Sequence, residues 1–283
     1  MATIKELKEG MQFNAGLIDL LEVMKSAAVF QFRSLQAKRE RYENFFKILD
    51  GFFQFIGDNG RDHILMAPKT ERRAVVMVTS DEGFMGNLNS QIINAAGKRD
   101  DFKEAELIIV GERGARYLKE MGRKFELFKS VVDASERRSL AEKLGTYIMS
   151  GIEEGRFGKL SIAYAKSISF MVQRVEVIDI LPLAQAAAAP SEKTGDKEEL
   201  IIESPLDAII DYLAGELVRQ RLIDVLEESK LSEFAARAIH LEGSLQELAE
   251  KQKKVRSQYF KAYHEMIDKS TRELFSAQIL IKR

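Results

Sequence analysis

Cysteine is absent from the 283-residue sequence, which excludes disulfides, thiolate metal sites, iron–sulfur clusters and cysteine nucleophiles. Histidine is scarce: His63 follows a polar loop, His240 and His264 lie in a helical segment near the C-terminus, and no HExxH-like pair occurs. We expect these three side chains at surface or seam positions, and we expect no metal site and no cofactor.

A long apolar run is also missing. No stretch approaches the ~20 apolar residues that a membrane-spanning helix needs, and the first ten residues are polar and helical in pattern, unlike a signal peptide. Neither charge dominates, because 43 Lys and Arg nearly balance 44 Asp and Glu, which disfavours both disorder and bulk attraction to nucleic acid. With 45% hydrophobic residues the chain can bury a core, and we expect it in the cytosol unless a partner holds it at a membrane.

Proline is missing from residues 4–56, where glycine occurs only three times among good helix formers. This composition predicts one very long helix. At ~1.5 Å per residue it extends about 75 Å, more than the diameter of a compact domain of this size, so it must protrude or find a partner. Its apolar positions recur in steps of four and three, as a heptad seam with polar interruptions. The seam consists of Leu7, Met11, Asn14, Ile18, Leu21, Lys25, Ala28, Phe32, Leu35, Arg39, Tyr42, Phe46 and Leu49.

A second proline-free stretch runs from Leu206 to the C-terminus. Its own, cleaner seam consists of Leu241, Leu245, Leu248, Gln252, Val255, Tyr259, Ala262 and Met266. We expect the two seams to pair as an antiparallel coiled coil made from the two ends of one chain. Two alternatives remain open: each stretch is an amphipathic helix in a bundle, or each is one half of a homodimeric coil.

Between these helices, short β-rich runs alternate with helical patterns. The β-rich runs are Ala74–Ser80, Glu106–Gly111, Leu160–Lys166 and Phe170–Leu181, and the helical patterns are Asn89–Arg99, Arg113–Met121 and Ser135–Glu154. This rhythm predicts a Rossmann-like three-layer α/β domain with a mainly parallel sheet, inserted between the long helices. We therefore expect an N-terminal helix (1–57), an α/β domain (58–205) with a surface loop at 184–199, and a C-terminal helix (206–283).

The string VTSDEGFMGNLN, residues 78–89, joins a predicted strand to a predicted helix. Its glycines permit a tight turn, and such a turn can present backbone N–H groups to a phosphate. However, the string lacks GxGxxG, the chain holds no GxxxxGK[ST], and Asp81 would repel a phosphate. We favour a structural corner capped by Asn89 or Asp81, with nucleotide binding as the alternative.

Paired carboxylates at 153–154 and 198–199 fall on predicted surface elements, so we expect no acid–base catalysis and no catalytic residue. Basic residues cluster on both long helices, and an antiparallel pair would merge them into one basic band. A protein partner fits this band better than nucleic acid, because stacking aromatics are not interleaved with it. The band consists of Lys25, Arg33, Lys38, Arg39, Arg41, Lys251, Lys253, Lys254, Arg256 and Lys261.

The order of these segments resembles the gamma subunit of rotary ATP synthases. The family loop reads approximately TSDRGLCGGLN, and it matches this sequence at Asp81, Gly83, Gly86, Leu88 and Asn89. The run from Ile178 to Leu183 resembles the family's LLPL, Glu203 and Pro205 resemble its YEP, residues 232–237 (SEFAAR) its SExAAR, and residues 259–262 (YFKA) its YNKAR.

The resemblance implies a non-catalytic rotor shaft inside a hexameric head of alpha and beta subunits. It also implies an epsilon subunit and a membrane ring of c subunits as partners, no nucleic acid and no small-molecule substrate, and a peripheral location on the cytoplasmic face of the membrane. The head contacts that it implies are Met24, Tyr259, Lys261, Ala262, Ile267 and Glu273, and Glu203 and Pro205 would lie on the ring side. Asp81, Gly83, Gly86 and Asn89 would form a structural loop.

Several positions depart from the family pattern. Glu82, Met85 and Asn87 differ in the loop, and Glu22 replaces a usual methionine. Further along, Tyr263, His264, Asp268 and Ser270 replace the usual residues after YNKA. These differences indicate a divergent rotor with a co-adapted head, or a paralogue with another partner. The alternative function is a nucleotide-binding α/β module with a coiled-coil oligomerisation stalk, and a free-standing coiled-coil tether is a third possibility.

Overall fold

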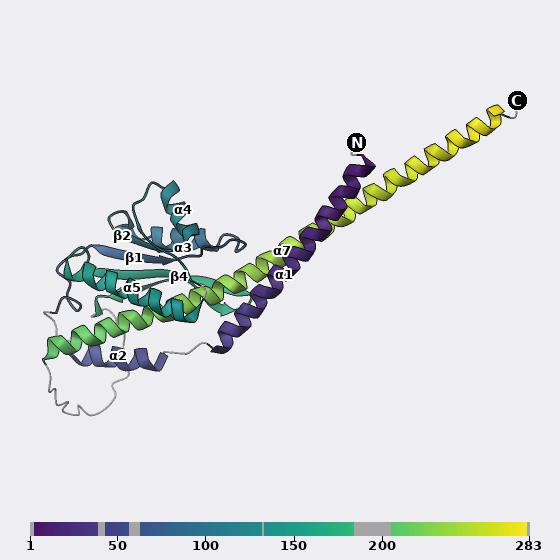
Figure 1. Ribbon diagram of the computed structural model, residues 1–283. Coiled ribbons are helices and arrows are strands. Elements are labelled where there is room, and N and C mark those ends of the chain that lie inside the picture. The colour runs from purple at the N-terminus through teal and green to yellow at the C-terminus, as the bar shows by residue number, and fades with distance from the viewer. Residues whose placement is uncertain (1–2, 39–42, 57–62, 132, 184–204, 282–283) are drawn as a thin grey trace. The chain divides into compact units, whose positions relative to one another are not determined.

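The computed structural model describes residues 3–38, 43–56, 63–131, 133–183 and 205–281 (Figure 1). The chain forms two compact units, one of residues 1–30 with 238–283 and the other of residues 31–237. Helices α1 (Ile4–Lys38) and α7 (Leu206–Ile281) each contribute to both units. The units therefore divide the chain inside these helices, whereas the sequence placed the boundaries near helix ends. The predicted loop at 184–199 lies outside the described residues.

The larger unit is built on a five-stranded sheet with the order β3-β2-β1-β4-β5. Its strands are β1 (Arg73–Val78), β2 (Glu106–Val110), β3 (Glu126–Phe128), β4 (Lys159–Ser169) and β5 (Val172–Leu181). β1 lies parallel to both β2 and β4, β2 lies parallel to β3, and only β5 runs antiparallel. The mainly parallel sheet is thus confirmed. The three-residue β3 was not predicted, because it is too short for a period to show.

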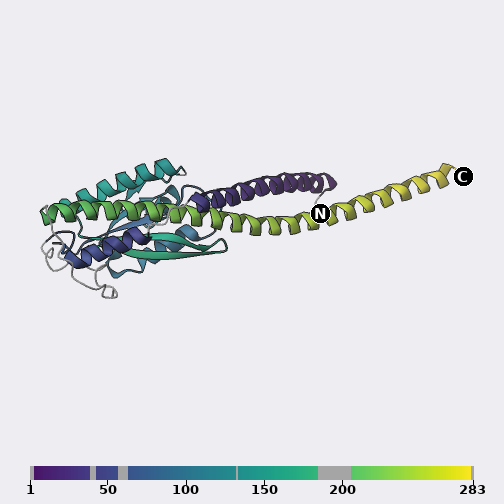
Figure 2. The same cartoon turned by 90° about the horizontal axis from the view of Figure 1, so that it is seen from below.

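Helices cover both faces of this sheet (Figures 1 and 2). Successive β1 side chains point to opposite faces. Val75 and Met77 pack in the core with α3 (Leu88–Gly97) and α4 (Glu112–Glu120), next to the 3₁₀ turn η1 (Asp100–Lys103). Val76 and Val78 pack in the other core, with α2 (Glu43–Ile56), α5 (Ala134–Glu153) and the first part of α7. The predicted three-layer α/β domain is confirmed.

The prediction of a single helix over residues 4–56 is wrong in its last part. The structure describes two helices, α1 and α2, and residues 39–42 between them lie outside the described residues. Leu49 and Phe53 of α2 are buried in the core against the sheet, and Phe46 lies under the guanidinium of Arg221 from α7. The spacing of apolar residues in α2 therefore reflects burial against the α/β core, not a continued coiled coil.

In the smaller unit, α1 and α7 pair as the predicted antiparallel coil within one chain. Leu21 is buried with Leu241 and Leu245. The Lys25 ammonium donates to the Glu242 carboxylate at 2.8 Å, and Gln252 Nε2 donates to the Met11 carbonyl at 3.0 Å. Residues of rising number on α7 thus meet residues of falling number on α1, which makes the pair antiparallel.

The predicted basic band is wrong, and the register of the coil gives the reason. Lys25 lies beside Glu242, but Gln252 lies beside Met11. The lysines and arginine from 251 to 256 therefore accompany the first turns of α1, and not the basic residues at 25, 33 and 38 that the band would need. In the part of the chain that the structure describes, no helix is both long and apolar enough to cross a membrane.

Candidate functional site

The corner between β1 and α3 is held by its own side chains. Asn89 Oδ1 accepts from the backbone N–H of Ser80 at 3.2 Å, and Asn89 Nδ2 donates to the Ser80 hydroxyl at 2.9 Å. Asp81 Oδ1 accepts from the backbone N–H of Glu112 at 2.7 Å. Asp81 therefore satisfies the first turn of α4, while Asn89 closes the corner from the first turn of α3.

Two residues of this corner have positive φ angles. Gly86 has φ +58°, a conformation that glycine adopts without a steric penalty. Phe84 has φ +64° with a half-exposed side chain, an uncommon conformation for a residue with a Cβ. Gly83 lies close to the Arg113 guanidinium, which a Cβ would approach to 2.9 Å. Gly86 thus serves the shape of the backbone, and Gly83 leaves room for the Arg113 side chain.

The hydrogen bonds of the corner also bear on phosphate binding. The backbone N–H groups of Ser80 and Glu112 donate to side chains, and that of Arg113 donates to the Ser80 carbonyl at 3.0 Å. A phosphate cradle needs such N–H groups to point at the ligand. These three donate within the protein, so the corner gives the nucleotide-binding alternative no support.

Opposite this corner, residues 228–235 of α7 are buried on every side of the helix, and Arg237 is buried as well. The Lys230 ammonium pairs with the Glu233 carboxylate at 2.8 Å, and Arg237 pairs with Glu233 at 2.7 Å. Removing one partner of a buried ion pair leaves an uncompensated charge inside the protein, which is strongly destabilising. Each of these three side chains therefore depends on its partner being in place. We call residues 228–237 the root segment of α7.

Arg237 connects the root segment to the corner. Its Nε donates to the Gly83 carbonyl at 3.3 Å, and its Nη2 pairs with the Glu82 carboxylate at 2.8 Å. The two family-like strings, residues 78–89 and 232–237, therefore meet in space. Glu82, a departure from the family pattern, thus forms an ion pair at a position where the family loop carries an arginine. Sequence reasoning gave neither Glu82 nor Arg237 a role.

The root segment also bonds to the backbone of β4. The Ser232 hydroxyl donates to the Ala165 carbonyl at 2.9 Å, and the backbone N–H of Ser167 donates to Glu228 Oε1 at 2.8 Å. The nearby charges, Glu176 among them, add to burial in raising the pKa of the Tyr164 hydroxyl. Ser232 belongs to the string SEFAAR that resembles the family, but nothing in the sequence pointed to a role for Glu228.

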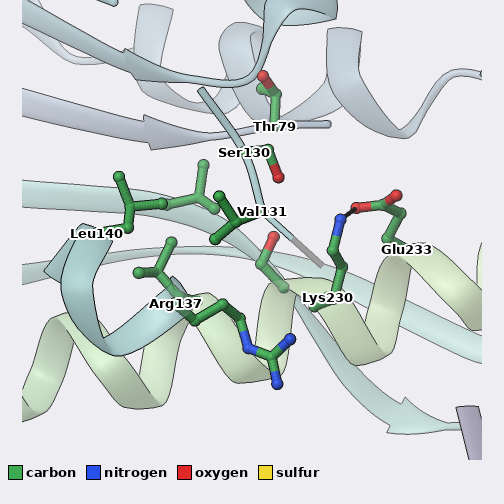
Figure 3. Close-up of a pocket in the computed structure, with 10 residues that line it drawn as sticks. Thr79, Ser130, Val131, Arg137, Leu140, Lys230 and Glu233 are labelled. Carbon is green, nitrogen blue, oxygen red and sulfur yellow. Dashed lines mark hydrogen bonds and ion pairs between the residues drawn. The ribbon is translucent and has the colours of Figure 1, made fainter. Parts of the chain in front are cut away.

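A small crevice lies beside the root segment, at the carboxyl end of β1 (Figure 3). Thr79, Ser130, Arg137 and Lys230 contribute polar atoms to its lining, with Glu233 bonded to Lys230. Burial lowers the pKa of the Arg137 guanidinium, and Glu227 and Asp133 partly oppose this effect. The crevice therefore combines charges of both signs, and it favours neither an anionic nor a cationic ligand.

The residues expected to contact the head do not gather at one site. Met24 packs against the buried core of the coil. Tyr259 is half-buried and stacks on Tyr263 with ring centroids 6.0 Å apart. The remaining expected residues on α7 are Lys261, Ala262, Ile267 and Glu273, and all but the half-buried Ala262 are exposed.

On the ring side, Pro205 is exposed and directly precedes α7, where its carbonyl accepts from Ile209 N at 3.2 Å. Glu203 lies outside the described residues.

The expectation for His63 is wrong. Its side chain is only 8% exposed, and its Nε2 lies 3.1 Å from the Asp211 carboxylate of α7. His240 and His264 are exposed. Among the described residues, no group of three histidine, aspartate or glutamate side chains could hold a metal ion.

A model of the family described as ATP synthase matches residues 3–277. The chain is 24% identical over 296 residues to an ATP synthase gamma chain of Syntrophobacter fumaroxidans, and the match covers 100% of both chains. It is 27% identical over 227 residues to one of Clostridium acetobutylicum, covering 78% of this chain and 75% of the relative.

Solved structures show the same fold. A chain of the Euglena gracilis mitochondrial ATP synthase, in a structure of OSCP, F1 and the c-ring, has a TM-score of 0.69 at 14% identity and covers 98% of this chain and 94% of its own. A chain of the Tetrahymena thermophila mitochondrial ATP synthase central stalk and c-ring has a TM-score of 0.56 at 19% identity, covering 80% and 99%. Because the family model spans almost the whole sequence, this chain belongs to the ATP synthase gamma-chain family.

Proposed function

We propose that this chain is the central rotor shaft of an F-type ATP synthase, where it couples proton or sodium translocation through a membrane ring to ATP synthesis or hydrolysis in a catalytic head. One observation carries the proposal: α7 is a single helix of 76 residues that is rooted in the α/β core and also forms the coil with α1. A shaft must be stiff and firmly held to transmit rotation, and this helix meets both needs.

The proposed partners are the alpha and beta subunits of the head, an epsilon subunit and a ring of c subunits. The chain would sit peripherally on the cytoplasmic face of the membrane, held by the complex, and would carry no catalytic site or cofactor of its own. Nucleotide chemistry would belong to the head, and the chain would bias the head's conformations by presenting different faces to its catalytic sites.

The exposed end of α7 supports contact with a partner. Met266, Ile267, Leu274 and Phe275 are large apolar side chains on a helix whose neighbouring residues are also exposed. Exposed apolar side chains of this kind are typical of interaction surfaces. We propose that the head covers them, together with Tyr259, Lys261, Ala262 and Glu273, and that it covers Met24 on α1. Glu203 and Pro205 are proposed for the ring side.

The test is reconstitution of the complex in vesicles with and without this chain. With the chain present, we expect ATP hydrolysis to drive ion transport, measured with a fluorescent ion or pH indicator, and we expect an inhibitor of the ring to slow hydrolysis. Without it, hydrolysis and transport should be independent. Full coupling in the absence of the chain would contradict the proposed function.

A further inference from the structure

Three polar side chains of the root segment, Glu228, Ser232 and Arg237, bond to the α/β domain from different sides of the helix. Glu228 and Ser232 are one turn apart and bond to the backbone of β4. Glu233 and Arg237 are also one turn apart, and Arg237 bonds to Gly83 and Glu82 of the corner. At ~100° per residue, the nine steps from 228 to 237 make about two and a half turns, so Glu228 and Arg237 project in directions about half a turn apart.

These bonds differ in kind from the apolar contacts of the same segment. Leu231, Phe234 and Ala235 pack in one cluster with Phe32. Apolar contacts stabilise the packed helix but do not depend on direction. A hydrogen bond, in contrast, weakens steeply once its angle departs far from linearity. A rotation of α7 by one residue position would carry the Ser232 hydroxyl away from the Ala165 carbonyl and Glu228 away from Ser167 N–H.

Burial makes these bonds hard to exchange for water. Ser232 is fully buried and Glu228 is 2% exposed. A buried polar group that loses its partner is left without compensation, so a rotated helix would carry unpaired groups on the side facing β4. The arrangement therefore opposes rotation of the helix about its own axis more than apolar packing alone would.

We propose that Glu228 and Ser232 are positioning residues that lock α7 against rotation about its own axis, so that torque passes between the α/β domain and the shaft through the backbone of β4. The proposal rests on the proposed rotor function. It assigns to Glu228 and to Ser232, the first residue of the SEFAAR string, the role of fixing the orientation of α7 relative to β4.

The experiment compares variants in the assembled complex, with the head immobilised and a probe attached to the α/β domain. Ser232→Ala removes the donor, and Glu228→Leu removes the acceptor at similar volume. The double variant removes the bonds to β4 and leaves those of Arg237. We expect the probe's angle to spread more widely during each pause between rotation steps. The variance of this angle should be about twofold larger, because two of the four bonds named above between the root segment and the α/β domain are gone.

Two controls separate positioning from stability. Glu228→Gln retains a side-chain oxygen that can accept from Ser167 N–H. In a chain that keeps Ser232, this variant should show the narrow angular spread of the wild type, unlike Glu228→Leu. Leu231→Ala removes a buried apolar side chain from the same segment without removing a polar bond, so it should lower the melting temperature but leave the angular spread unchanged.

The outcomes are distinguishable. If the wild-type complex does not rotate, the proposed rotor function fails. If the wild type rotates and the double variant keeps its angular spread, the lock is refuted while the rotor function stands. An equal widening in Leu231→Ala would also refute the lock, because general loosening of the core would then be the cause.

Discussion

Two stretches of the same helix differ in what surrounds them. In the root segment, residues 228–235 are buried on every face, and charged side chains are paired inside the protein. From residue 263 to 276, every side chain is exposed, large apolar ones included. One helix can therefore be anchored at one stretch and offered to a partner at another. The root segment includes buried charged side chains among its apolar ones, and the distal stretch includes exposed apolar side chains among its charged ones.

The largest effect is expected at the buried charges. Arg237→Ala would leave Glu233 buried without that partner and would release the corner, so we expect the free energy of unfolding to fall by about 3–5 kcal/mol. Urea denaturation followed by circular dichroism measures it. Glu82→Gln is the matched control, because Glu82 is largely exposed and its ion pair should contribute less than about 1 kcal/mol. An equal loss in both variants would contradict the role of burial.

A somewhat smaller effect is expected in the coil. Leu241 is fully buried against Leu21, and Leu241→Ala should lower the free energy of unfolding by about 2–4 kcal/mol through lost burial and a cavity. The exposed Leu274 provides the comparison, since Leu274→Ala should change stability by less than about 0.5 kcal/mol. Similar losses at both positions would show that the distal stretch is packed in the free chain.

A partly exposed group of charges, centred on Arg73 at the start of β1, provides a comparison with the buried charges of the root segment. Burial acts to raise the pKa of the Asp101 carboxyl, but its hydrogen bond to Arg73 and the charges of Arg73 and Arg99 outweigh burial, so the pKa is lowered. The contribution of Asp101 to the free energy of unfolding is thus complete above the ordinary aspartate pKa. It is lost as pH falls through the lowered pKa of Asp101 in the folded chain.

Asp101→Asn should therefore flatten the decline of unfolding free energy between about pH 4 and pH 2. Acid titration followed by circular dichroism measures this slope. Asp100→Asn, at the exposed neighbouring position, is the control. An unchanged slope in Asp101→Asn would contradict the coupling to Arg73.

The smallest effect on the free chain is expected at the distal stretch, where the effect on assembly should be large. Leu274→Asp should leave the melting temperature unchanged, because this side chain is 67% exposed. It should lower the yield of assembled complex, measured by size-exclusion chromatography with purified head subunits, because a charge would enter an apolar contact. Normal assembly would show that the head does not cover Leu274.

Local periodicity explains what could be predicted. Every seam position of α1 from Leu7 to Leu35 is buried or half-buried, because a heptad pattern reports which face is buried. The same logic misled at α2, since Phe46 and Leu49 have the spacing of a coil, but Leu49 packs in the α/β core and Phe46 lies under the Arg221 guanidinium. A period identifies a buried face but not the partner that buries it.

The bonds of the root segment could not be predicted for a different reason. Arg237 and the Gly83 carbonyl are 154 positions apart, and Ser232 and the Ala165 carbonyl are 67 apart. Such pairs depend on the completed fold and leave no local pattern. The burial of His63 against Asp211 is a further instance, because a histidine after a polar loop gives no sign of a partner on a distant helix.

Rotation of the α/β domain relative to the head tests the central claim most directly. Because the chain has no cysteine, a single cysteine introduced at the exposed Arg174 gives a unique site for a probe, with the head immobilised and ATP supplied. The account predicts stepwise rotation of the probe in one direction, which stops when ATP is removed. A complex that hydrolyses ATP while the probe on this chain stays still would contradict it.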